Sequence, residues 1–425
     1  MSKSNQGTKK WLSFAVMLLA AGTVYKLYFM DGVFYVQMRD FMGLSNTQIG
    51  LLTTIAGWIS TFSFLAATYI TDRFSKKKLI PFALIADGLL GIIVSTFPPY
   101  HIMLPCFCLF AVCADMLFWP TMLKTIRLLG NDSEQGRMFG LLETGRGLVD
   151  TVVNFSALAV FVWLGSNALG LRGAILFYSG IIMAIGIMSF FLLEDDKIAE
   201  IKDTSEKNRI VFSGMKTVFK NKGIWLVGFN AFMVYAAYTG IKYFSPFLND
   251  VYAMPVALVS AYSIINSYGL KMLGGPVGGF ISDKVTKSSA KFIRITFVVA
   301  VFALIVFIMM PPQTTSVYVA VVFALGISSL MFCMRAVYFA PMSEVGVPTE
   351  NTGSAMALGS FIGYLPGAFM NLIYAPILDS NPGYSGYKIV FIIMMGISVV
   401  GVLVSSMLVR TIKRTKTCEN TASES

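Results

Sequence analysis

The strongest constraint on this chain is a series of long apolar runs. Twelve runs are long enough to cross about 30 Å of hydrocarbon as helices that rise about 1.5 Å per residue. They fall at 11–37, 46–71, 79–97, 102–123, 138–163, 173–193, 223–248, 255–281, 292–311, 316–340, 354–378 and 387–409. Only 13% of residues are charged, against roughly 25% in soluble domains. The sequence therefore predicts an all-α integral membrane protein with twelve transmembrane helices.

One long charged segment interrupts this series, between the sixth and the seventh span. It reads EDDKIAEIKDTSEKNRIVFSGMKTVFKNK and covers residues 194–222. We therefore expect an N-terminal six-helix half at 1–193, a cytoplasmic linker at 194–222, a C-terminal six-helix half at 223–410 and a cytoplasmic tail at 411–425.

The distribution of basic residues predicts the topology, because Lys and Arg accumulate in cytoplasmic loops. With the N-terminus inside, 25 basic residues fall on the cytoplasmic side. The outer side holds three, which are Arg39, Arg172 and Lys388. Both termini are therefore expected in the cytoplasm, with the chain in the bacterial inner membrane.

The composition also argues against several other classes of protein. A net charge of +11 can indicate nucleic-acid binding, but that function needs basic residues on a soluble face, and here they lie between apolar runs. The five cysteines have no zinc-like spacing. The sequence has no phosphate-binding loop and no histidine pair. We therefore expect no nucleic-acid partner, no metal, no cofactor and no catalytic residues.

Two pairs of matching segments indicate an internal repeat. Asp72-Arg73 follows the second span and Asp283-Lys284 follows the eighth, 211 residues later. In the same way, Gly136 enters the fifth span and Gly353 enters the eleventh, 217 residues later. The chain therefore contains one six-helix unit twice, which is typical of transporters built from internal repeats.

Together these features resemble the major facilitator superfamily of secondary transporters. The loop after span two has the pattern acid, basic, any, small, basic, basic, and the loop after span eight follows it except at the last position. Both are similar to the family motif. The family places Gly four residues before the acid and three after it, where this chain has Thr68 and Ser75, then Gly279 and Thr286. The resemblance covers nearly the whole chain and implies that spans one, four, seven and ten surround a central cavity.

Charged residues inside the predicted spans are expected to be functional, because each costs at least about 2.5–3.5 kcal/mol to insert. They are Lys26, Asp31, Asp87, Asp115, Glu143, Arg146, Asp150, Lys242, Lys271 and Arg335. The first half holds all five acids and two bases, and the second half holds three bases and no acid. An alternative is that opposite charges simply pair and hold the halves together.

Five of these residues are predicted to couple transport to protons: Asp31, Asp115, Glu143, Arg146 and Asp150. In the fifth span, Glu143, Arg146 and Asp150 fall on one helical stripe, within about 60° of one another. Since one base can neutralise only one acid fully, the other can carry a proton. The alternative is a purely structural ion cluster with Asp115.

The predicted substrate-binding residues are basic and aromatic residues of spans one, seven, eight and ten: Tyr25, Lys26, Tyr28, Tyr235, Tyr238, Lys242, Lys271 and Arg335. Tyrosine offers a hydroxyl group and a ring face, and the basic side chains offer charge. The tyrosines can instead serve helix packing or an interface belt. Lys242 can instead extend to the outer interface.

From these residues we expect a secondary transporter that moves a small polar, anionic organic metabolite with protons and works as a monomer in the lipid bilayer. Transport of a neutral nucleoside or sugar is the alternative within the same class. A sensor on the same scaffold is a further alternative, although the linker and the tail provide no signalling domain.

Asp72, Arg73, Asp283 and Lys284 are predicted to be gating residues. Asp72 lies at the C-terminal end of its span, where the helix dipole disfavours an anion, so it needs a partner. By resemblance to the family, the partner is the N-terminus of a facing helix or a nearby Arg, and the contact holds the inner gate shut.

Asp72→Asn is therefore expected to slow transport without abolishing substrate binding. The measurement compares uptake into proteoliposomes with binding to the purified variant. Turnover at the wild-type rate would leave this loop only a topological role.

Overall fold

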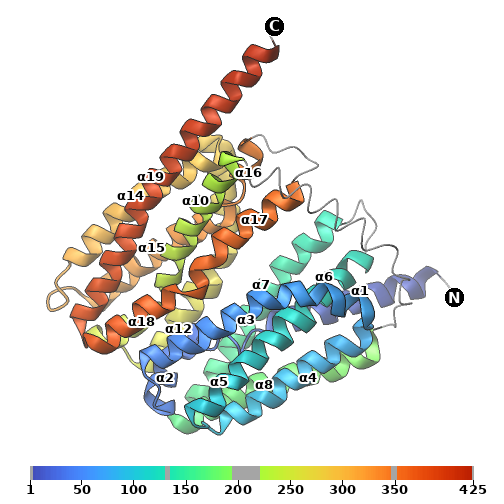
Figure 1. The fold of residues 1–425 in the computed structure, drawn as a ribbon. Helices are drawn as coiled ribbons and strands as arrows, with labels where there is room; N and C mark the ends of the chain where they lie inside the picture. Colours follow the sequence, from blue (N-terminus) through green and yellow to red (C-terminus); the bar gives the residue numbers. More distant parts are fainter. Residues whose placement is uncertain (1–2, 130–134, 194–220, 346–351, 424–425) are drawn as a thin grey trace. The chain divides into compact units, whose positions relative to one another are not determined.

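The computed structural model describes residues 3–129, 135–193, 221–345 and 352–423. Within these ranges the chain forms helices and turns and contains no strand (Figure 1). The predicted all-α class is confirmed. The chain divides into two compact units. Unit 1 is Met1–Ile201 with Pro255–Gly269, and unit 2 is Lys202–Met254 with Leu270–Ser425.

Helices of both units follow the apolar runs. Those of unit 1 are α1 (Lys3–Thr23), α2 (Asp31–Met42), α3 (Asn46–Arg73), α4 (Lys76–Ser95), α5 (Tyr100–Ala111), the π-helix η1 (Val112–Phe118), α6 (Trp119–Leu129), α7 (Gln135–Trp163), α8 (Ala168–Leu192), α12 (Val256–Ile264) and the π-helix η4 (Ile265–Gly269). The predicted half boundaries at 193 and 223 stay a prediction.

Unit 2 contains the later helices. They are α10 (Lys222–Thr239), the 3-10 helix η3 (Gly240–Tyr243), α11 (Phe244–Tyr252), α13 (Leu270–Phe280), the π-helix η5 (Ile281–Thr286), α14 (Ser289–Met309), α15 (Val317–Val337), α16 (Pro341–Glu344), α17 (Thr352–Tyr364), the 3-10 helix η7 (Leu365–Ala368), α18 (Met370–Ser380) and α19 (Tyr384–Ser423). The long helix α19 ends near the C-terminus (Figure 1).

Nine helical segments of the described residues are long and apolar enough to cross a membrane. They coincide with predicted spans three to seven and nine to twelve. The three other predicted spans coincide with α1 and α2, with α3, and with α12, η4 and α13. All twelve predicted runs are therefore helical.

Several of these helices are interrupted where polar residues enter the apolar run. Between α1 and α2, residues 24–30 form turns, with the Lys26 N–H bonded to the Thr23 carbonyl at 3.0 Å. Span four contains the π-helix η1, and span seven contains η3. Such interruptions are tolerated in a membrane protein only where the freed backbone groups are buried in protein or line a watery cavity.

Close packing of α4 against α8 depends on small residues. These helices run side by side in unit 1 (Figure 1). A Cβ at Gly88 would lie 2.2 Å from Met183 Cγ and 2.8 Å from the Ser179 carbonyl oxygen. No side chain larger than hydrogen fits there, so Gly88 sets the distance between the two helices.

Unit 2 is organised around an aromatic core. Phe244 stacks on Phe391 with ring centroids 5.0 Å apart, and Phe307 meets Phe391 edge to face at 5.2 Å. Phe247 lies 5.5 Å from Phe307. These rings join α11, α14 and α19 in geometries that stabilise aromatic pairs.

Gly88→Ala is expected to destabilise the protein by about 1–3 kcal/mol, because a methyl group overpacks the α4–α8 contact. Gly180→Ala on α8 is the matched control, since nothing lies within 4 Å of a Cβ at that position. Thermal unfolding in detergent measures both variants. Equal melting midpoints for the two would contradict this account of the helix contact.

Candidate functional site

Three predicted substrate residues lie on the interrupted segment of the first span. Residues 24–30 connect α1 to α2 and carry Tyr25, Lys26 and Tyr28. Lys26 and Tyr28 are buried, whereas Tyr25 is partly exposed. The turns therefore place a base and two phenols between two apolar helices of unit 1.

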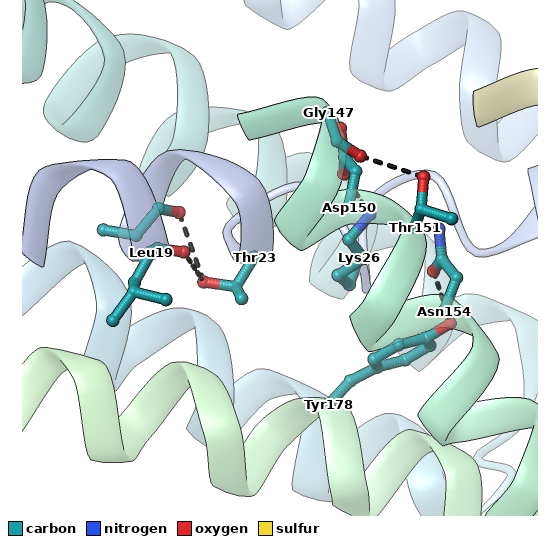
Figure 2. Close-up of polar contacts among 9 residues, drawn as sticks. Leu19, Thr23, Lys26, Gly147, Asp150, Thr151, Asn154 and Tyr178 are labelled. Carbon is teal, nitrogen blue, oxygen red and sulfur yellow. Dashed lines mark hydrogen bonds and ion pairs between the residues drawn. The ribbon is translucent and has the colours of Figure 1, made fainter. Parts of the chain in front are cut away.

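Lys26 forms an ion pair with Asp150 of α7. The two residues are 2% and 8% exposed. The Lys26 ammonium also lies 4.5 Å from the centroid of the Tyr268 ring, which belongs to η4 in the same unit. Figure 2 shows Asp150 on one helix with Thr151 and with Asn154, which accepts a hydrogen bond from Tyr178 at 2.8 Å. A buried ion pair is stable only when its geometry is good, because both charges have lost their hydration.

Asp115 is the centre of a second polar group in unit 1. It lies on η1 and accepts hydrogen bonds from the Tyr25 hydroxyl at 2.7 Å and from the Ser60 hydroxyl. Tyr28 and Ser60 share a further hydrogen bond of 3.0 Å. The carboxyl group of Asp115 is thus held by hydroxyl groups. A hydroxyl group can donate and accept hydrogen bonds, so it can bond to either the charged or the protonated carboxyl group.

The remaining predicted coupling residues have different surroundings. Arg146 lies 5.0 Å from the centroid of the Trp119 ring, a cation–π contact. Asp31 is buried at the first residue of α2. The Glu143 side chain lies outside the described residues. A shared stripe for Glu143, Arg146 and Asp150 stays a prediction, and the partner of Asp150 that the structure records is Lys26.

In unit 2, Arg335 lies among four tyrosines. Its guanidinium is 4.2 Å from the Tyr238 ring centroid and 5.6 Å from that of Tyr235. Tyr338 and Tyr364 share a hydroxyl–hydroxyl bond of 2.8 Å, and Tyr364 meets Tyr235 edge to face at 5.2 Å. We call these five residues the Arg335 cluster. They come from α10, α15 and α17, except Tyr338, which directly follows α15.

The charge of Arg335 has aromatic rather than anionic neighbours. In the described part of the chain, Arg335 forms no ion pair. Its side chain is partly exposed. Because an arginine does not lose its charge in a protein, this guanidinium can bind an anion that is not part of unit 2.

The other predicted substrate lysines lie on different elements. Lys242 lies on η3, 5.5 Å from the centroid of the Tyr243 ring. It follows Lys26 by 216 residues, close to the repeat offset, so the two lysines occupy equivalent interruptions of spans one and seven. Lys271 is exposed on α13. Neither η3 nor α13 supplies a residue of the Arg335 cluster.

The predicted gating residues are described only in part. The side chains of Asp72 and Arg73 lie outside the described residues. Asp283 and Lys284 are exposed on η5. A different acid meets a helix start in unit 2: Glu344 accepts hydrogen bonds of 2.6 Å from the Ser289 N–H and from the Ser288 hydroxyl, at the beginning of α14.

Some contacts involve residues that the sequence analysis did not single out. Ser60 holds Asp115, Tyr364 closes the Arg335 cluster and Glu344 caps α14. The signal for Glu344 is an acid between two predicted spans, at the end of the short helix α16. Ser60 and Tyr364 have no comparable signal, because Ser and Tyr are ordinary packing residues in spans. Among the described residues, no group of three His, Cys, Asp or Glu side chains can hold a metal ion.

Residues 12–371 match the family model of the Major Facilitator Superfamily. The chain belongs to this superfamily. Membership makes it a membrane transporter of small molecules and not an enzyme. The predicted resemblance is confirmed over nearly the whole chain.

Relatives and solved structures agree with this assignment to the superfamily. Inner membrane protein YihN of Escherichia coli is 47% identical over 413 residues, covering 96% of this chain and 97% of YihN. A bacterial homologue of the human lysosomal transporter Spinster has a similar fold, with a TM-score of 0.75, 14% identity and coverage of 98% and 99%. The nucleoside transporter NupG gives a TM-score of 0.69 at 14% identity, covering 95% and 98%. The chain is thus a multi-pass protein of the bacterial inner membrane.

Removing one partner of the Lys26–Asp150 pair is expected to cost about 3–5 kcal/mol of stability, because the other charge then stays buried alone. Lys26→Met and Asp150→Asn test this loss, and the double variant should be more stable than either. Thermal unfolding in detergent is the measurement.

The exposed pair Arg39–Asp40, with N–O distance 2.8 Å, provides the control for this prediction. Asp40→Asn should cost no more than about 1 kcal/mol. If the losses of the two single variants simply add in the double variant, the ion pair does not contribute as described.

Proposed function

We propose that this protein is a secondary transporter that moves a small polar, anionic organic metabolite by alternating access coupled to protons. The observation that carries the proposal is the Arg335 cluster, a permanently charged guanidinium among four tyrosines with no ion pair in the described part of the chain. Membership of the superfamily supports alternating access.

The Arg335 cluster combines the contacts that bind an organic anion. A guanidinium presents several donors in a planar fork that matches a carboxylate or a phosphate. The rings of Tyr235 and Tyr238 hold that fork from its sides, which reduces the rotamer freedom lost on binding. The hydroxyl groups of Tyr338 and Tyr364 offer additional polar contacts for the rest of the metabolite.

Proton coupling is proposed for unit 1. Asp115 is held by Tyr25 and Ser60, and Asp150 by Lys26. A carboxyl group in hydrocarbon is stable either when paired or when protonated, so gain and loss of a proton can change these contacts during the cycle. We further propose that both termini are cytoplasmic and that the monomer is the functional form.

Neutral nucleosides are the second candidate substrate class. The specific observation in their favour is the four ring faces of the Arg335 cluster, since aromatic rings stack on bases. NupG is described as a nucleoside transporter. For such a substrate the guanidinium would contribute less than the rings.

Replacement of Arg335 distinguishes these classes. Arg335→Gln is expected to abolish binding of the anion, and Arg335→Lys to weaken it about tenfold or more, because an ammonium keeps the charge but lacks the planar fork. The measurement is ligand-induced thermal stabilisation across carboxylates, sugar phosphates, hexuronates and neutral nucleosides.

Arg172→Gln is the matched control. Arg172 is exposed and lies 4.8 Å from the centroid of the Phe97 ring, so its replacement removes a similar cation–π contact elsewhere. Binding of anions should survive in this variant. Unchanged anion binding in Arg335→Gln, or stabilisation by neutral nucleosides alone, would contradict the proposed anionic substrate.

A further inference from the structure

A buried carboxyl group in α4 has no part in the site described above. Asp87 lies near the middle of α4 and is 0% exposed. Its neighbours on the same helix face include Ala83, Leu84 and Gly91, all of them buried. An acid in this place interrupts the apolar surface along which the helix packs.

Neither carboxyl oxygen of Asp87 forms a hydrogen bond within the described part of the chain. The other central acids of unit 1 differ in this respect. Asp150 is paired with Lys26, and Asp115 accepts bonds from two hydroxyl groups. Asp87 is therefore the one of these three acids whose charge has no compensation from the described side chains.

Four elements pack against α4, namely α8, η1, α5 and α6. From η1, the buried Cys113 carries a free thiol. From α8, the Tyr178 hydroxyl donates a hydrogen bond to Asn154 of α7 and not to Asp87. From α5, Cys106 and Cys108 carry free thiols. No described basic group forms a hydrogen bond or an ion pair with Asp87.

Two further charged residues belong to α6. They are Lys124 and Arg127, and their side chains lie outside the described residues. Among the described residues, no donor and no cation thus bonds to the Asp87 carboxyl group. An ionised carboxylate without a donor or a cation costs several kcal/mol in such a place, and the neutral carboxyl group costs much less.

We propose that Asp87 is a proton-binding site of unit 1, which holds a proton in the state that the structure describes and releases it during transport. The inference rests on the proposed proton coupling and names a group that carries the proton. It differs from Asp115 and Asp150, because neither carboxyl oxygen of Asp87 has a hydrogen-bond or ion-pair partner among the described side chains.

The π-helix η1 connects Asp87 to the rest of unit 1. It packs against α4 and carries Asp115, which is bonded to the partly exposed Tyr25. Segments of π-helix occur frequently at functional sites. In the proposed exchange one proton moves between Asp87 and Asp115, so that one carboxyl group is neutral when the other is charged.

Infrared difference spectroscopy tests this site without a substrate. The purified protein in lipid bilayers is compared between mildly acidic and alkaline buffers, and the signal is the carbonyl stretch of a protonated carboxylic acid. We expect a band in the mildly acidic buffer that is lost in the alkaline buffer and is absent from Asp87→Asn. In Asp87→Glu the band should shift in frequency, which provides the test if the Asn variant does not fold.

Asp40→Asn is the control, since Asp40 is exposed and paired with Arg39, and its spectrum should match the wild type. A spectrum of Asp87→Asn that retains every band would show that Asp87 is ionised and would overturn the proposal. A band that persists at alkaline pH would overturn it too, because the proton would never leave.

The transport readout separates this inference from the proposed function. The substrate for this assay is an anion that binds the wild-type protein in the thermal-stabilisation measurement described for Arg335. With this anion, Asp87→Asn should lose uptake driven by a pH gradient but retain counterflow exchange. If gradient-driven uptake stays at the wild-type rate, the role of Asp87 is wrong while the anion site stands. If no anion binds the wild-type protein, the proposed substrate class fails, and the infrared result still decides whether Asp87 exchanges a proton.

Discussion

The cost of a charge in hydrocarbon is the constraint on which the rest of this structure depends. An isolated charge in a span costs several kcal/mol, so each needs a partner, a ring face or a proton. Unit 1 meets this cost in different ways: Lys26 pairs with Asp150, Arg146 lies over Trp119, and Asp87 is buried without a partner among the described residues. Unit 2 meets it with the ring faces around Arg335.

Most of the fold could be predicted from the sequence, because the length of an apolar run and the bilayer thickness determine which segments become spanning helices. The interruptions of these helices were harder to predict. Nothing in the string TVYKLYFMD requires turns at residues 24–30, and the buried partner of Lys26 lies 124 positions away in the sequence. The π-helix η1 likewise has no local signal in its sequence.

The candidate site could be predicted as a set of residue types but not as a set of contacts. Helical spacing related Asp150 to Arg146 on the same helix, whereas the structure pairs Asp150 with Lys26. The excess of basic residues in the second half drew attention to Arg335, and the structure adds Tyr364 to its surroundings from a different helix. Contacts between helices depend on their rotation and depth, which the sequence of one helix does not contain.

The central claim is that the charge asymmetry between the two halves serves the transport of an organic anion with protons. Uptake by the purified protein in proteoliposomes tests it most directly, with a panel of anionic, neutral and cationic solutes and with a pH gradient either imposed or collapsed. The account predicts that an organic anion accumulates and that collapse of the gradient abolishes the accumulation. Uptake restricted to neutral or cationic solutes would contradict it.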